Sequence, residues 1–435
     1  MRFVIAAIIV TALAAGALLG GVVRESRSAE PVAPTSAVQA ESLRSEFGSG
    51  DTVSLLRRLQ GEARARPDSA QTNALLGLAY AQRARETGDA AYYTRAEAVL
   101  RRAHELEPKN VYALTGLGGL ALARHRFADA LEIGREARAA APSSAAPYGI
   151  VGDALTELGR YDEAFAAFDR MAALKPNASS YSRVSYAREV TGDVPGAIET
   201  MELALDASIG RPEASAWTAV ELGKLHWSVG RVSPAAASFK LALQLVPGYA
   251  PALDALARVE AARGRTERAI ALQRQAVEAI PLPHLVAQLG DLLAVAGRPA
   301  DAKEQYALVG AIEQLQIASG VETDLETALF RIDHGIRLRE TLRLARAARA
   351  ARPSVLGDDV LAWALVRNGR CDEARVASER SLRLGQRDAG FFFHRGMIER
   401  CLGNRDAARK WFTRALDLNA SFSILWAPVA RKAVS

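Results

Sequence analysis

Six histidines and two cysteines are the side chains of this 435-residue sequence best suited to metal binding or nucleophilic catalysis. No two histidines stand three or four residues apart, the spacing that places two metal ligands on one face of a helix. His334 and His394 remain candidates for a cryptic catalytic site, although no motif places a nucleophile beside either. The full set is His104, His125, His226, His284, His334, His394, Cys371 and Cys401.

Motifs for phosphate, nucleotide or acyl-transfer chemistry are absent from the sequence. It has no G-x-x-x-x-G-K-[ST] loop, no G-x-G-x-x-G fingerprint and no G-x-S-x-G elbow. Neighbouring acids such as Asp162-Glu163 and Asp358-Asp359 stand at expected helix starts, where carboxylates complement the helix dipole. We therefore predict no catalytic residue, no metal and no cofactor, and a protein that is not an enzyme.

A repeat of about 34 residues organises the chain. Pro108, Pro142 and Pro176 follow one another at this spacing, and an alanine stands five residues before most such prolines. A Gly-Arg or Gly-Asp pair, as at Gly159 and Gly192, falls midway between prolines. This spacing predicts a helix, a glycine turn, a second helix and a proline stop in each unit.

The pattern resembles the tetratricopeptide repeat (TPR) family over residues 51–420. The resemblance implies an all-α, right-handed superhelical α-solenoid of about ten helix-turn-helix units. An insertion between Tyr80 and Ala96 is expected to lengthen the helices or the turn of the first unit, and residues 421–435 are expected to cap the last one. We place the units at 70–110, 111–144, 145–178, 179–212, 216–249, 250–282, 283–316, 322–355, 356–388 and 389–420, after a lone helix at about 51–66.

Some segments resemble a more specific group, a bacterial TPR family of unassigned activity. They include Ser180-Tyr181-Ser182-Arg183 and the run from Phe393 to Ile398. This resemblance brings no reaction with it.

The N-terminus contains an uncharged run from Phe3 to Val23, which as a helix would span ~31 Å. Residues 1–23 are either a cleaved signal peptide or an uncleaved transmembrane anchor. A short apolar N-terminal segment is normally a translocation signal, so we expect the repeat domain outside the cytoplasm, in the periplasm or at the cell surface. Residues 24–50, rich in Ser, Pro and Gly, are expected to form a flexible linker.

The net charge of +6 arises from 55 basic and 49 acidic residues interleaved along the chain. The densest basic run, from Arg337 to Arg352, lacks the interleaved aromatic residues that stack on bases, so we predict no nucleic-acid partner. We interpret the run as a solvated outer face. An anionic partner or a lipid phosphate is the alternative.

Cys371 and Cys401 stand 30 residues apart, near the inter-helix turns of consecutive units. Stacked units bring such turns close together, so a disulfide is expected if the domain lies outside the cytoplasm. Two unpaired, partly buried cysteines are the alternative.

In TPR proteins the first helix of each unit lines a concave groove, and the resemblance places aromatic and charged residues of this chain there. Trp217 and Trp227 flank Lys224 on one helix. Such a centre suits a peptide or helix with apolar anchors and acidic groups, unless one Trp is structural. The predicted groove residues are Arg183, Trp217, Lys224, Trp227, Asp254, Arg258, Phe330, Arg367 and Phe393.

These features predict a protein–protein interaction scaffold at the cell envelope. It would bind a peptide or helical segment of a partner in its concave groove, and contact the membrane through residues 1–23 if these are not cleaved. The alternative function is an accessory or regulatory subunit of an envelope enzyme or transporter complex.

Overall fold

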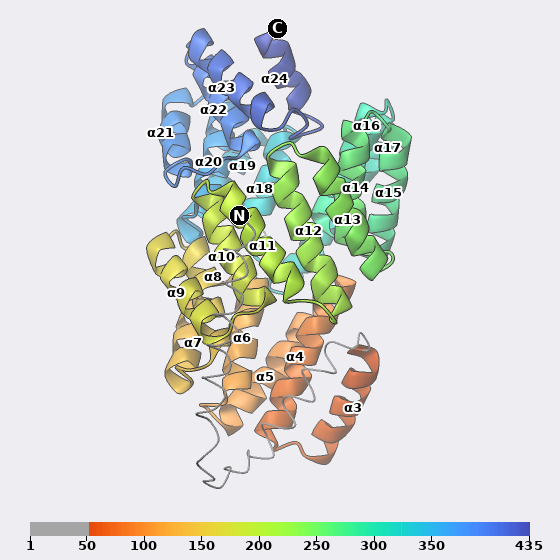
Figure 1. The fold of residues 1–435 in the computed structure, drawn as a ribbon, viewed down its shortest axis with the longest axis vertical. Helices are drawn as coiled ribbons and strands as arrows, with labels where there is room; N and C mark the ends of the chain where they lie inside the picture. The colour runs from red at the N-terminus through yellow and green to blue at the C-terminus, as the bar shows by residue number, and fades with distance from the viewer. Residues whose placement is uncertain (1–51, 323) are drawn as a thin grey trace, which may run out of the picture. The chain divides into compact units, whose positions relative to one another are not determined.

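The computed structural model describes residues 52–322 and 324–435, which form helices joined by short turns (Figure 1). The predicted N-terminal segment 1–23 and linker 24–50 lie outside these residues. Among the described helices, none combines the length and the apolar character needed to cross a bilayer.

A single helix, α3 (Thr52–Ala65), precedes ten consecutive helix pairs in the described part of the chain, and α24 (Ala427–Val434) follows them. The first helices of the pairs are α4 (Ala70–Thr87), α6 (Val111–Ala123), α8 (Ala145–Glu157), α10 (Ala178–Val190), α12 (Pro212–Ser228), α14 (Ala250–Ala262), α16 (Pro283–Val295), α18 (Asp324–Asp333), α20 (Val355–Arg367) and α22 (Ala389–Cys401). The second helices are α5 (Ala91–Leu106), α7 (Phe127–Ala140), α9 (Tyr161–Leu174), α11 (Val194–Asp206), α13 (Val232–Leu245), α15 (Thr266–Ala279), α17 (Pro299–Ala318), α19 (Leu338–Ala351), α21 (Cys371–Ser381) and α23 (Arg405–Leu418). The fold is the predicted right-handed superhelical α-solenoid.

The two helices of a pair approach closely because a glycine on the first faces a large ring on the second. A Cβ atom added to Gly152 would lie 2.3 Å from Cε1 of Phe168, a distance that real Cβ atoms do not adopt. A glycine at this position of the first helix is therefore a steric requirement of the fold. Equivalent glycine and ring pairs are Gly223 with Phe239, Gly290 with Tyr306 and Gly396 with Phe412.

The first pair and the start of α12 depart from the regular unit. The insertion lengthens both helices of the first pair, because α4 has 18 residues and α5 has 16, against 13 in α6 and 14 in α7. Pro212 was expected to close a unit. It is instead the first residue of α12, a position where the missing N–H group costs no helical hydrogen bond.

Successive turns of the superhelix contact each other directly. The turn inside each of the first five pairs meets the end of the pair five positions later, and we call this line of contacts the seam. In Figure 1 the helices α8–α11 accordingly lie beside α20–α22. The seam joins Gly88 to Ile280, His125 to Glu322, Gly159 to Pro353, Gly192 to Gly385 and Gly230 to Leu418.

Hydrogen bonds connect the two turns of the superhelix at several points of the seam. The Val355 amide donates to the Tyr161 hydroxyl over 2.8 Å, and Nδ2 of Asn419 donates to the Trp227 carbonyl over 2.7 Å. The guanidinium of Arg352 donates to Glu157 across the seam. Because these groups are buried or partly buried, each bond satisfies polar atoms that water reaches less freely than at the surface.

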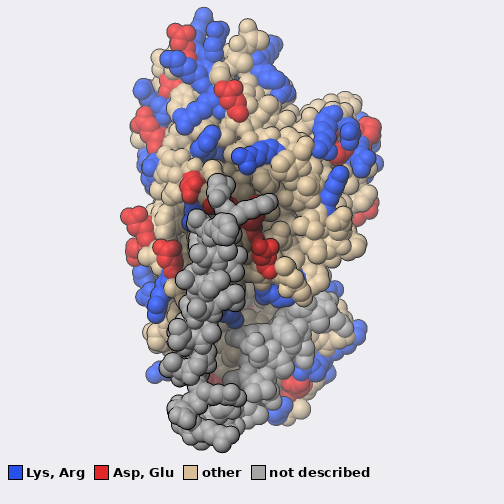
Figure 2. All heavy atoms as spheres, viewed as in Figure 1, with Lys and Arg blue, Asp and Glu red and all other residues tan. Residues whose placement is uncertain are grey.

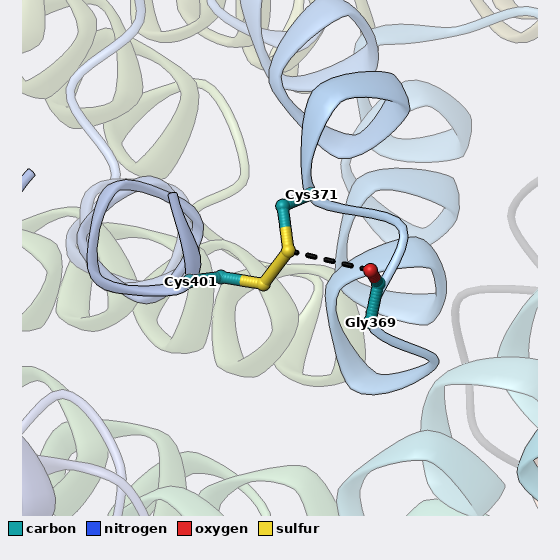
Figure 3. Close-up of a disulfide and its surroundings, with 3 residues drawn as sticks. All are labelled: Gly369, Cys371 and Cys401. Atoms are coloured by element: carbon teal, nitrogen blue, oxygen red, sulfur yellow. Dashed lines mark hydrogen bonds between the residues drawn. A yellow bond between two sulfur atoms is a disulfide. The ribbon is translucent and has the colours of Figure 1, made fainter. Parts of the chain in front are cut away.

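A disulfide between Cys371 and Cys401 joins the last two helix pairs (Figure 3). Cys371 begins α21 and Cys401 ends α22, so the bridge connects the turns of consecutive units. Their Cα atoms are 5.8 Å apart, and the Cys371 Sγ atom lies 3.4 Å from the Gly369 carbonyl oxygen. The crosslink closes a loop of 30 residues.

Candidate partner-binding groove

The first helices of the pairs carry a line of charged side chains, several of which already have partners. Arg183 on α10 forms a two-bond ion pair with Asp153 on α8, with N···O distances of 2.8 and 2.6 Å. Lys224 bonds Glu221 over 2.8 Å, but its side chain is 57% exposed. Of these two predicted groove cations, Lys224 is the one whose charge is more accessible.

The two tryptophans of α12 have different surroundings. Trp217 is 42% exposed, whereas Trp227 is half-buried and packs against the core formed by α12, α13 and α14. Trp217 is thus an accessible aromatic surface, and Trp227 has a structural contact as well as an accessible edge.

A cavity of about 400 Å³ lies between α12, α14, α16 and the C-terminal segment, and we call it the groove cavity. It brings together Trp227 and Arg258, two of the residues predicted from the sequence, but not Trp217 or Lys224. Its apolar wall includes Leu292 and Val295 of α16. The C-terminal segment contributes Phe422, Ile424 and Arg431.

A polar network supports one side of this cavity. Asp254 accepts hydrogen bonds from Nε2 of Gln273 at 3.0 Å and from Nε of Arg258 at 3.3 Å, and Gln288 donates to Gln273 at 3.3 Å. Asp254 is only 9% exposed, so it positions Arg258 and does not itself face a partner.

The C-terminal segment, predicted from the sequence to cap the last unit, packs on α23 and also reaches residues of earlier pairs. The Trp426 indole N–H donates to Asp333 over 2.9 Å, and the Arg367 guanidinium lies 5.4 Å from the Trp426 ring centre. Phe393, predicted to face the groove, is fully buried, with its ring 5.7 Å from that of Trp426. It cannot contact a partner in this structure because the C-terminal segment covers it.

Phe330, another predicted groove residue, belongs to an aromatic cluster around His334. Its ring lies 5.9 Å from Tyr306 and 4.5 Å from His334. His334 hydrogen-bonds Asp291 through Nε2 and the Phe330 carbonyl through Nδ1, both over 2.7 Å. Burial opposes a charge on His334, but its bond to Asp291 raises its pKa overall.

His394 forms a similar buried pair, with Nδ1 2.8 Å from Asp359 and its ring stacked on Trp363. Although burial disfavours its charge, Asp359 raises the pKa of His394. Neither His334 nor His394 bonds a serine, threonine or cysteine in 52–322 or 324–435. The described residues also contain no group of three or more metal-ligating side chains. Both histidines therefore have structural partners, and neither bonds a nucleophilic side chain in the described part of the chain.

A carboxyl group with a strongly shifted pKa lies where the two turns of the superhelix face each other. Burial raises the pKa of Glu189 to about 7, and the negative charges of Asp388 and Glu221 add to the shift. Lys224 offsets part of it. Glu189 on α10 precedes Asp388, the N-cap residue of α22, by almost two hundred residues in sequence, so the shift arises from the winding of the chain.

Consecutive helix pairs wound into a superhelix, with an inner face of paired polar groups and an apolar cavity, define a helical-repeat protein. The tetratricopeptide repeat family profile matches residues 88–145, 152–212, 220–282 and 360–421, more than half of the chain, and the chain belongs to this family. TPR proteins are generally non-catalytic scaffolds that bind protein partners. The resemblance seen in the sequence is thereby confirmed for the TPR repeats.

The similar proteins are distant. Human tetratricopeptide repeat protein 36 is 34% identical over 99 residues, 23% of this chain and 49% of that protein, so the match spans about half of its length. The structure of the human IFIT1 dimer with PPP-AAAA is 15% identical, with a TM-score of 0.48 over 80% of this chain and 85% of that one. The APC/C hetero-tetramer Cut9-Hcn1 is 16% identical, with a TM-score of 0.39 over 88% and 82%. Likeness at these identities concerns the fold alone.

Proposed function

We propose that this chain is a scaffold of the cell envelope that holds a peptide or helical segment of a partner protein in its inner groove, and that it has no catalytic activity of its own. The groove cavity is the observation that carries this proposal. It combines an aromatic edge of Trp227, the apolar wall at Leu292 and the partly exposed guanidinium of Arg258. Such a set recognises an apolar side chain next to an acidic group.

Trp217 and Lys224 extend this surface along α12. Trp217 is 42% exposed, and the Lys224 side chain is 57% exposed. A bound segment that continues from the cavity along the helix would bury the indole and approach the ammonium group. The partner would thus bury its apolar anchor side chain at Trp227 and make further contacts at Trp217.

Site-specific photo-crosslinking in cells tests the proposal. A benzoylphenylalanine replacing Val295, which lines the groove cavity and is 54% exposed, should crosslink a specific protein. The same group replacing Val376 on the second helix α21, 53% exposed, is the matched control and should not. Crosslinking from Val376 alone would move the interface to the outer helices and reject the groove.

A second set of variants connects the crosslink to the groove residues. Trp227→Ala combined with Arg258→Ala should abolish the crosslink from Val295. The control, Lys240→Ala with Leu241→Ala on the outer helix α13, should leave it intact, because both side chains are exposed there. Circular dichroism establishes that each variant is folded. Recovery of one fixed enzyme or transporter would favour the accessory-subunit role within the same scaffold function.

The envelope location rests on the apolar run from Phe3 to Val23. Alkaline phosphatase fused after residue 50 should be active, since this enzyme requires export, whereas a fluorescent protein exported in the unfolded state should remain dark. The reverse result would place the repeats in the cytoplasm.

A further inference from the structure

A second cavity of the described residues, about 770 Å³, lies at the seam and not in the groove. The first turn of the superhelix contributes Val194 and Ile198 of α11, with Arg231 just before α13. The second turn contributes α22 and α23. We call it the seam cavity. It shares no lining residue with the groove cavity, and most of its wall comes from second helices of the pairs.

Basic side chains dominate the wall of the seam cavity. Five cations face it against a single carboxylate, Asp417. They are Arg231, Arg387, Arg409, Lys410 and Arg414. Figure 2 shows Lys and Arg side chains gathered on the end of the visible face that carries α22–α24.

Most of these cations have no anionic partner within the described residues. Arg231, Arg387, Arg409 and Lys410 form no ion pair and no side-chain hydrogen bond there, unlike Arg183 and Arg352, whose charges are matched by carboxylates. Like charges around one hollow repel each other, and walls of low polarizability concentrate their field. An anion entering the cavity relieves that repulsion.

The floor of the cavity is apolar. Val194, Ile198, Phe392 and Leu418 line it and are each at least 93% buried. The Arg414 guanidinium lies 4.1 Å from the Phe392 ring centre, which covers that ring. A ligand that fits must combine negative groups at the rim with an apolar group at the bottom.

We infer that the seam cavity binds an acidic segment of a partner protein that inserts an apolar side chain between the two turns of the superhelix. A nucleic acid fits less well because no exposed aromatic ring is available for base stacking here. A lipid surface is the other source of negative charge, and vesicles test it separately. Because both turns contribute to the wall, the bound segment connects them across the seam.

Fluorescence anisotropy with synthetic peptides tests the inference on the purified repeat-containing chain. A labelled peptide of alternating Glu and Leu should bind, and the same peptide with Gln for Glu should bind at least about tenfold more weakly. The variant Arg409→Glu with Lys410→Glu should weaken the Glu/Leu peptide by about tenfold or more. Both side chains are exposed, so the charge reversal does not disturb the core.

The matched control is Arg339→Glu with Arg343→Glu. These two exposed arginines belong to a basic patch on α19 outside the seam cavity, and replacing them changes the net charge by the same amount. It should keep the peptide affinity within about twofold of the wild type. If both variants bind the Glu/Leu peptide equally weakly, the loss of affinity comes from net charge alone, and the inference is overturned. Failure of the Glu/Leu peptide to bind, or equal binding of the Gln peptide, would overturn it as well.

Vesicles containing phosphatidylglycerol distinguish the other source of negative charge. The vesicles could bind the wild type but not the Arg409→Glu/Lys410→Glu variant, with no displacement by the Glu/Leu peptide. In that case the ligand is a membrane and the peptide inference is wrong. The crosslink from Val295 provides an independent measurement of the groove. Its presence or absence does not depend on Arg409 or Lys410, so the two proposals fail separately.

Discussion

Replacing the seam glycine Gly159 by alanine tests whether the two turns of the superhelix are in contact. Gly159 has φ +70°, and an added Cβ atom would lie 2.3 Å from the Pro353 carbonyl oxygen on the next turn. Gly264 occupies the equivalent place in its own pair with φ +75°, but a Cβ atom there would meet nothing within 4 Å. The substitution Gly264→Ala therefore reproduces the backbone strain without the steric clash.

The expected difference follows from these geometries. A left-handed backbone costs each alanine about 1–2 kcal/mol. At Gly159 the seam must also open by roughly 1 Å to restore a normal contact, which as overpacking costs about 1–3 kcal/mol. Opening weakens the bond from the Val355 amide to Tyr161, and an unsatisfied buried amide costs about 1–3 kcal/mol. Gly159→Ala should thus lower the free energy of unfolding by about 2–6 kcal/mol more than Gly264→Ala.

Urea denaturation of the two variants gives this difference, and hydrogen exchange locates it. The Val355 amide should exchange faster in Gly159→Ala and at the wild-type rate in Gly264→Ala. Gly192→Ala provides a second case, because its Cβ atom would lie 2.5 Å from the Gly385 carbonyl oxygen. Equal losses of stability in the seam variants and in Gly264→Ala would refute the stacked arrangement of the turns.

Three further perturbations have defined expectations. The folded-state pKa of Glu189, about 7, exceeds its ordinary value of 4.5, so its contribution to stability is complete below pH 4.5 and is lost as the pH rises through 7. Glu189→Gln should remove that decline and stabilise the protein at pH 8 by about 1–3 kcal/mol, measured by urea midpoints across this range. Loss of the bridge in Cys371→Ser/Cys401→Ser should cost about 3–4 kcal/mol for a 30-residue loop. Thermal unfolding with and without dithiothreitol should show the same loss in the wild type and no effect in the variant. Gly152→Ala should destabilise the protein by about 1–3 kcal/mol. Gly119→Ala, with nothing within 4 Å of its Cβ atom, should stabilise it by up to ~1 kcal/mol. Chemical denaturation of both variants measures the two changes in the free energy of unfolding, which should have opposite signs.

The local architecture could be predicted from the sequence because its signals are local. A helix pair depends on residues within about 34 positions of each other, and the prolines, alanines and glycines recur at that spacing. The lone helix α3 and the lengthening of α4 and α5 follow from the same alignment. The alignment placed Pro212 at the end of a unit, which is wrong, because a proline suits the first turn of a helix as well as the end of a unit.

The partner of a polar side chain could not be predicted, whether it lies in a neighbouring unit or, at the seam, almost two hundred positions away. Asp358 and Asp359 were interpreted as helix-start acids, and α20 does begin three residues before Asp358. Yet Asp358 is 1% exposed and accepts hydrogen bonds from Arg349, Arg380 and Arg383, while Asp359 bonds a histidine of α22. An acid at a helix start has the same sequence signature whether it faces water or a cluster of arginines.

The same limit explains why only part of the predicted groove set can contact a partner. Buried polar groups need hydrogen-bond partners, so a residue on the inner face of a tightly wound solenoid tends to bond another inner residue. Arg183 and Asp254 follow this rule, and their charge or polarity is already used within the fold. Side chains that remain accessible, such as Trp217 and Lys224, have a surface left for recognition. Repeat position fixes which face a residue occupies, whereas its availability to a partner depends on neighbours that the winding of the chain supplies.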